Sequence, residues 1–168
     1  MAICALELSM GKRTPLFDRH RAAGARIVDF AGWDMPVNFG SQLEEHHAVR
    51  RNAGMFDVSH MTQVDIAGRD AQTLLQRVCA NDVGRLTDGA ALYTCLLNEA
   101  GGVIDDGIVY RLAPRSYRLV VNAATRDRDM EWLREHAEGH DLALEERAEL
   151  AMAAVQGPEA RTRAHEVL

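Results

Sequence analysis

The sequence predicts an α+β fold in which antiparallel strands form a sheet with helices against one face. From residue 62 onward, the predicted elements run strand, helix, hairpin, strand, helix, strand, and the connections between them are short. Strands also outnumber helices in this part of the chain. A chain of 168 residues is long enough for one ordinary domain or for two small ones.

The composition excludes several classes of protein. The apolar fraction of 47% is normal for a globular protein, and no apolar run approaches the roughly 20 residues of a membrane span. A formal net charge of −6 argues against nucleic-acid binding, which requires a basic patch. The three cysteines, Cys4, Cys79 and Cys95, fit neither a disulfide framework nor a C-x-x-C motif. The cytoplasm is therefore the expected location.

The N-terminal residues 1–13 lack the basic segment, the long apolar core and the cleavage site of a secretory signal. We interpret them as a loose leader, with Met10 as an alternative start. Thr14 and Pro15 then predict the start of a helix, because a hydroxyl cap followed by proline favours the first turn. Gly24 is expected to end this helix.

A short strand is predicted over 26–30, followed by an irregular loop over 31–40 that contains glycines and a proline. Trp33 in this loop is interpreted as a packing anchor rather than a ligand contact. Ser41 and Glu44 form a capping box that starts a helix running to about residue 52.

Three polar residues close to one another, Asp57, Ser59 and His60, raise the question of a catalytic triad or a metal site. One histidine with one nearby aspartate offers too few ligands for a metal. The adjacent His46 and His47 point about 100° apart on a helix, so they do not share one face. No metal site is therefore predicted, and the sequence contains no nucleophile-elbow or P-loop pattern.

The elements expected from residue 62 onward follow the apolar periodicity. The predicted helix over 70–79 has an apolar stripe formed by Ala71, Leu74, Leu75 and Val78. The other predictions are strands over 62–67, 117–122, 142–145 and 151–156, a hairpin over 90–110, and a helix over 125–137. A last helix is predicted to open at Gly157-Pro158 and to run uncapped to the final residue, which suggests a truncated reading frame.

The hairpin over 90–110 turns at N-E-A-G-G, and its second strand is expected to begin at Val103. Alternation places Asp105 and Asp106 on opposite faces, with Asp106 on a face otherwise formed by Ile104, Ile108 and Tyr110. A lone carboxylate on an apolar face is costly unless it is paired. Either the strand bulges or ends here and both carboxylates lie in water, or Asp106 faces a pocket that requires one negative charge.

Six motifs occur in the order and spacing of one known family. They are T-P-L-F at Thr14, D-F-A-G-W-D-M-P at Asp29, G-M-F-D-V-S-H-M at Gly54, N-E-A-G-G-V-I-D-D at Asn98, V-V-N-A-A at Val120 and V-Q-G-P at Val155. In these motifs the chain resembles the glycine cleavage system T-protein, the tetrahydrofolate-dependent aminomethyltransferase. The resemblance covers nearly all of the chain after the leader.

The resemblance implies a function and its partners. The family acts on the aminomethyl group carried by the lipoyl arm of the H-protein, releases ammonia and passes the one-carbon unit to tetrahydrofolate. The implied partners are the lipoylated H-protein and folate, with tetrahydrofolate as co-substrate. The alternatives are a folate-dependent demethylase, the folate module of a sarcosine- or dimethylglycine-type dehydrogenase, and a folate-binding remnant without turnover.

The resemblance also implies site residues. Asp106 matches the catalytic carboxylate, and Tyr93, Asn122 and Val120 match positions that line the folate. From the residues alone, Tyr93 is equally an ordinary cross-strand aromatic, and Asn122 is equally a capping residue for the helix that begins near Thr125.

The family organisation implies that the chain contains two domains. Residues 14–61 with 150–168 would form part of a first folate-binding domain, and residues 62–149 a ferredoxin-like middle unit inserted into it. The C-terminal half of the family, which supplies a glutamate and arginines against the folate tail, is absent from these 168 residues.

Overall fold

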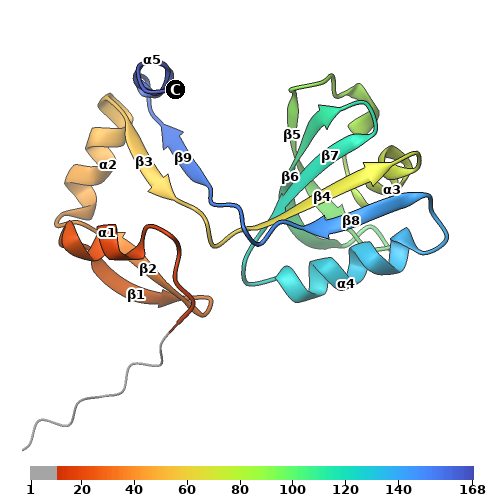
Figure 1. Cartoon of the computed structure of the whole chain (residues 1–168), viewed down its shortest axis with the longest axis horizontal. Helices are drawn as coiled ribbons and strands as arrows, with labels where there is room; N and C mark the ends of the chain where they lie inside the picture. Colours follow the sequence, from red (N-terminus) through yellow and green to blue (C-terminus); the bar gives the residue numbers. More distant parts are fainter. Residues whose placement is uncertain (1–10) are drawn as a thin grey trace, which may run out of the picture. The chain divides into compact units, whose positions relative to one another are not determined.

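The computed structural model describes residues 11–168, which form two compact units (Figure 1). The first unit contains residues 11–60 and 151–168, and the second contains residues 61–150. The chain therefore leaves the first unit, builds the whole of the second and then returns. Cys4, Met10 and most of the predicted leader lie outside the described residues.

The second unit is built on a five-stranded sheet in the order β5-β6-β7-β4-β8, with antiparallel pairing throughout. The order β8-β4-β7-β6 is that of a ferredoxin-like sheet, and β5 adds a strand at one edge. The predicted α+β class with antiparallel sheets is confirmed. The strands are β4 (Thr62–Gly68), β5 (Ala91–Leu97), β6 (Val103–Ala113), β7 (Ser116–Val121) and β8 (Leu142–Glu146).

Two helices, α3 (Ala71–Val78) and α4 (Arg126–Ala137), cover one face of this sheet, with the short helix η1 (Val83–Arg85) after α3 (Figure 1). The predicted stripe on α3 is confirmed, because all four of its residues are fully buried. Met130 and Leu133 of α4 pack into the same core. The sheet contributes the buried side chains of Val64, Ile66, Leu96, Val109, Tyr117, Leu119 and Val121.

The predicted hairpin is confirmed as β5 and β6, and β6 begins at Val103 as expected. A β-bulge interrupts its register, because Leu96 lies opposite Asp105 and Leu97 lies opposite Val103. Ile104 is the extra residue, and it packs against the helix-covered core. The prediction that Ile104 shares a face with Asp106 is therefore wrong.

The first unit contains a second hairpin, which the sequence did not indicate. The strands β1 (Arg26–Phe30) and β2 (Trp33–Asn38) pair through the two-residue turn Ala31–Gly32. Both turn residues have positive φ, 52° and 79°, as a tight hairpin requires. The region 31–40, predicted as a loop, is therefore mostly strand β2. The turn is hard to predict, because positive φ is rare at alanine and Ala-Gly is a weak turn signal.

A second strand pair in the first unit joins β3 (Gly54–Asp57) to β9 (Ala153–Gln156), so the chain pairs with itself after returning from the second unit. The helices are α1 (Phe17–Ala22), α2 (Gln42–Arg51) and α5 (Ala160–His165). The predicted cap of α2 is confirmed, because Ser41 Oγ accepts a hydrogen bond from Glu44 N at 3.3 Å.

Two predicted helix ends are wrong. The last helix ends at His165 and does not run to the final residue. At the other end of the chain, Thr14 does not cap α1, which begins at Phe17. Thr14 Oγ1 instead donates a hydrogen bond to Asp57 Oδ2 at 2.5 Å, so a tertiary contact replaces the local cap.

Candidate functional site

The candidate site lies on the face of the five-stranded sheet opposite α3 and α4, here called the second face. Residues directly opposite one another on neighbouring strands project to the same side. Register places Tyr93, Ile108, Val120 and Gln63 in one row across β5, β6, β7 and β4. Asp106 is two residues before Ile108 on β6, so it belongs to the same face.

Asp106 is the centre of a small polar group on this face. Tyr93 Oη donates a hydrogen bond to Asp106 Oδ2 at 2.9 Å. Asn122 Nδ2 approaches the carbonyl oxygen of Asp106 at 3.3 Å and its Oδ1 at 3.5 Å. Tyr93 is 65% exposed, and its hydrogen bond to Asp106 raises the pKa of the phenol.

The structure therefore brings together three of the four residues singled out in the sequence, Asp106, Tyr93 and Asn122. Val120 lies in the same row as Tyr93, separated from it by Ile108, and is 1% exposed. Tyr93 is both a cross-strand neighbour of Ile108 and a partner of Asp106, so the two interpretations of this residue are compatible.

Asn122 follows β7 and does not cap the next helix. The N-cap residue of α4 is Thr125, which makes no side-chain cap hydrogen bond. The Asn122 amide instead donates to Asp105 Oδ1 at 3.0 Å, in addition to its contacts with Asp106. It therefore links the two aspartates, although their side chains lie on opposite faces of β6.

Asp105, and not Asp106, is the aspartate on the helix-covered side, since it lies opposite the fully buried Leu96. Thr125 Oγ1 donates to Asp105 Oδ2 at 2.6 Å, and Asn122 donates to the other oxygen. Burial raises the pKa of Asp105, but hydrogen bonds from Thr125 and neighbouring groups outweigh it and hold the pKa below its ordinary value.

Sequence reasoning missed Asp129, whose side chain is fully buried beside Asp105. A signal for it exists in the sequence. Asp129 is four residues before the core residue Leu133, so a helix places both on the apolar stripe of α4.

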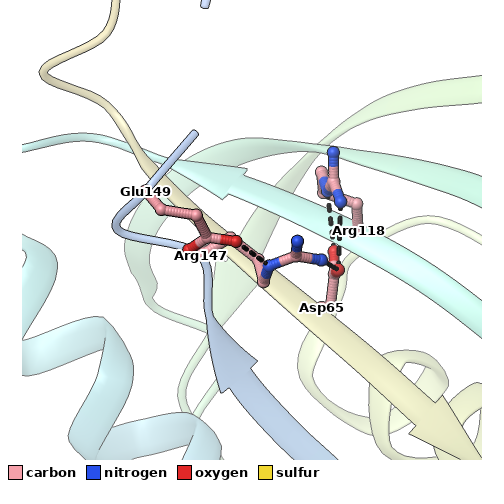
Figure 2. A network of polar contacts seen from close by, with 4 residues as sticks. All are labelled: Asp65, Arg118, Arg147 and Glu149. Carbon is pink, nitrogen blue, oxygen red and sulfur yellow. Dashed lines mark hydrogen bonds and ion pairs between the residues drawn. The ribbon is translucent and has the colours of Figure 1, made fainter. Parts of the chain in front are cut away.

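A second polar group on the second face joins three strands through Asp65 of β4 (Figure 2). Arg118 of β7 donates two hydrogen bonds to its carboxylate, at 2.6 and 3.0 Å. Arg147, just after β8, donates to Asp65 at 2.5 Å and to Glu149 at 2.6 Å. Bidentate pairing between arginine and carboxylate fixes geometry as well as charge, so this group ties β4, β7 and the end of β8 together.

Replacing Asp65 by asparagine is expected to lower the free energy of unfolding by about 1–3 kcal/mol at pH 7, because two arginines lose the negative charge and one of the two oxygen acceptors that they share. The hydrogen bond from Arg118 lowers the pKa of Asp65 below its ordinary 3.8. As the pH falls, the unfolded chain takes up this proton first. The stabilisation is therefore present above about pH 4 and lost as the pH falls through the lowered pKa.

Urea unfolding of wild type and Asp65→Asn from pH 7 to pH 2.5 measures this difference. Asp127→Asn is the matched control, since Asp127 is 92% exposed and pairs only at the surface. If the difference in the free energy of unfolding between wild type and Asp65→Asn stayed constant down to pH 2.5, the ionised Asp65 carboxylate would not be the source of this stability.

In the first unit, Asp57 is an anchor for tertiary contacts. Its side chain is fully buried and accepts hydrogen bonds from Thr14, from Ser59 N at 3.0 Å and from His20 Nε2 at 2.9 Å. Burial raises the pKa of Asp57, but these hydrogen bonds outweigh it and leave the pKa below its ordinary value. His60 packs edge-on against Phe30, with 5.5 Å between ring centroids.

Two further features concern residues 11–168 only. No three His, Cys, Asp or Glu side chains in this range gather as metal ligands would, and none of its helices combines the length and apolarity needed to cross a bilayer. Cys79 and Cys95 are free thiols, and burial raises the pKa of Cys79 to about 12, so it stays protonated at neutral pH.

Comparison with known proteins identifies the family. Residues 16–168 match the model of the GCVT N-terminal domain. Curated relatives named aminomethyltransferase from Bordetella petrii and Alcanivorax borkumensis are 62% and 60% identical over 155 and 152 residues. Each of these alignments covers 90% of this chain but 42% of the relative, so the chain spans about two fifths of the length of these proteins.

A solved structure agrees with this result. The crystal structure of glycine cleavage system aminomethyltransferase T from Bartonella henselae resembles 92% of this chain with a TM-score of 0.87 and 35% identity. The similarity covers 43% of that protein. The chain therefore belongs to the GCVT N-terminal domain family, and these three similar proteins are named aminomethyltransferases.

Proposed function

We propose that this chain supplies the carboxylate site of a glycine cleavage aminomethyltransferase. The enzyme transfers the one-carbon unit of the aminomethyl-lipoyl H-protein to tetrahydrofolate and releases ammonia. The observation that carries the proposal is the placement of Asp106 between Tyr93 and Asn122 on the second face. The names of the relatives favour this reaction over a demethylase or a dehydrogenase module.

The proposed transfer balances without an oxidant. The methylene carbon loses its bonds to the lipoyl sulfur and to the amino nitrogen, and it gains bonds to two folate nitrogens. Two N–H protons of the folate are released, one reaching the sulfur and the other the departing ammonia. The chemistry supplied by folate is this pair of nucleophilic nitrogens.

The residues on the second face fit a pterin ring, which is flat and carries N–H donors. Tyr93 offers an exposed aromatic ring for stacking, and Ile108 supplies apolar surface beside it. The carboxylate of Asp106 can accept hydrogen bonds from ring nitrogens. A mainly apolar surface with a few fixed polar groups is the usual composition of a small-molecule site.

The role we assign to Asp106 is electrostatic and proton-accepting. A fixed carboxylate stabilises the positive charge that develops on the one-carbon unit as ammonia leaves, and it can accept a proton released by the acceptor nitrogen. Tyr93 and Asn122 each donate toward a different oxygen of Asp106, which holds the carboxylate in one orientation. Because the carboxylate is already oriented, little free energy is needed to rearrange it as the positive charge develops.

The 168-residue chain by itself is expected to bind tetrahydrofolate weakly and to release no measurable ammonia from aminomethylated H-protein. The physical reason is length: the chain spans 42% of its relatives, and residues outside it would complete the folate site. Calorimetric folate titration and an ammonia assay, with the full-length Bordetella petrii enzyme as control, test this. Ammonia release at a rate close to that of the control would contradict the expectation.

A hybrid enzyme tests the proposed function itself. We expect residues 1–168, joined to the C-terminal portion of the Bordetella petrii relative, to form an active enzyme. It should release ammonia efficiently only when both aminomethylated H-protein and tetrahydrofolate are present. A folded hybrid that binds neither folate nor H-protein would overturn the proposal.

A further inference from the structure

Asp129 lies in the first turn of α4, and its side chain is 0% exposed. It is next to Met130, and Leu133 lies one turn further along the same buried stripe. Within residues 11–168, neither of its carboxylate oxygens has a hydrogen-bond partner of good geometry. The hydroxyl of Thr125 donates to Asp105 and offsets only part of the rise in the pKa of Asp129. A buried and ionised carboxylate without donors is strongly disfavoured, so this group requires a proton or a cation.

Cations do not meet this requirement. Arg128 is the neighbouring cation, but its Nε is 3.9 Å from Asp129 Oδ1 and its side chain is 57% exposed. The Arg128 guanidinium also donates to the carbonyl oxygen of Ile104. The other charged group that acts on Asp129 is the carboxylate of Asp105, reaching it from β6. Burial and this like charge raise the pKa of Asp129 to about 7.

Asp105 has the opposite environment. It already accepts hydrogen bonds from Thr125 and Asn122, both of which favour its ionised form. Two neighbouring carboxyl groups with environments that differ in this way share one proton, which lies on the one with fewer donors. A protonated Asp129 becomes a donor itself, directed toward Asp105.

The pair is connected to the second face through Asn122. The Asn122 amide donates to Asp105 and also contacts the carbonyl oxygen and the carboxylate of Asp106. A change in the position of Asp105 therefore changes the position of the amide that orients Asp106.

We propose that Asp129 is a positioning residue that holds a proton against Asp105, so that the pair carries one negative charge and keeps Asn122 in place beside Asp106. When Asp129 loses its proton, repulsion between the two carboxylates displaces Asp105 and loosens Asn122. The catalytic consequence rests on the proposed function of Asp106. The shared proton and the position of Asn122 do not depend on that function, and both are measurable in the 168-residue chain.

The first measurement is stability against pH for wild type and Asp129→Asn. The folded-state pKa of Asp129 is raised, so folded wild type holds one more proton than the unfolded chain between about pH 4 and pH 7. The folding equilibrium constant of wild type should therefore fall relative to Asp129→Asn by up to about tenfold per pH unit over this range, then level off. Parallel curves from pH 4 to pH 8 would show that Asp129 holds no such proton.

The second measurement reports on position. In wild type, the side-chain amide NMR signals of Asn122 should shift in a titration centred near pH 7. In Asp129→Asn they should stay at their low-pH position, because the amide of asparagine is neutral and can still donate to Asp105. Asp129→Ala removes both the donor and the charge, so its Asn122 signals should likewise show no shift centred near pH 7; a shift there in either variant would assign the titration to a group other than Asp129.

The outcomes separate the possible failures. If the stability curves differ as expected but the Asn122 signals of wild type do not move near pH 7, the positioning role is overturned. If both measurements agree with the proposal and the hybrid enzyme shows no folate-dependent ammonia release, the proposed function fails while the shared proton stands.

Discussion

Replacing Asp106 by asparagine in the hybrid enzyme is expected to lower the rate of ammonia release by about 10²–10⁴-fold, the usual contribution of a general base or electrostatic stabiliser. Asparagine has nearly the same shape as aspartate, so the packing beside Ile108 and the hydrogen bond from Tyr93 can persist. The negative charge is lost. Folate binding should change much less than turnover, because the stabilised charge develops only as the reaction proceeds.

The measurement compares ammonia release and folate affinity for wild type, Asp106→Asn and Glu131→Gln. Glu131, an exposed residue of α4, provides the matched control, since α4 covers the opposite face of the sheet. Asp105→Asn is not a neutral comparison, because Asp105 accepts hydrogen bonds from Thr125 and Asn122. Turnover by Asp106→Asn within a factor of three of wild type would remove Asp106 from the mechanism.

Replacing Leu74 by alanine is expected to lower the free energy of unfolding by about 2–5 kcal/mol, the range observed for large-to-small changes in a packed core. Leu74 lies on the inward stripe of α3 and is 0% exposed. Truncation removes apolar contacts and leaves a cavity between α3 and the sheet, which a close-packed core fills only in part. A loss of this size is a large fraction of the stability of an ordinary domain.

Denaturant unfolding monitored by circular dichroism measures the effect of Leu74→Ala. Thr73→Ala is the matched control, because Thr73 is the preceding residue of the same helix and is exposed. The control should change stability by no more than about 0.5 kcal/mol. A difference between the two variants of less than 1 kcal/mol would mean that α3 does not pack on the sheet as described.

Local sequence patterns determined several elements of both units. The apolar stripe of α3, the N-cap of α2 by Ser41 and the hairpin of β5 and β6 each depend on neighbours along the chain, and all three are confirmed. The hairpin β1–β2 was missed because its turn, Ala31–Gly32, requires positive φ at an alanine. The strand β3 was missed because its partner β9 lies far away in the sequence.

The sequence by itself also determined that Asp105 and Asp106 point to opposite faces of one strand, because side chains alternate in any strand. Only the tertiary structure decided which face the helices cover, since alternation does not distinguish the two sides of a sheet. The bulge at Ile104 turned an apolar side chain to the side of Asp105 and left Asp106 with Tyr93. Periodicity places Asp129 on the apolar stripe of α4, but its position beside Asp105 depends on how α4 lies against β6, which only the tertiary structure decides.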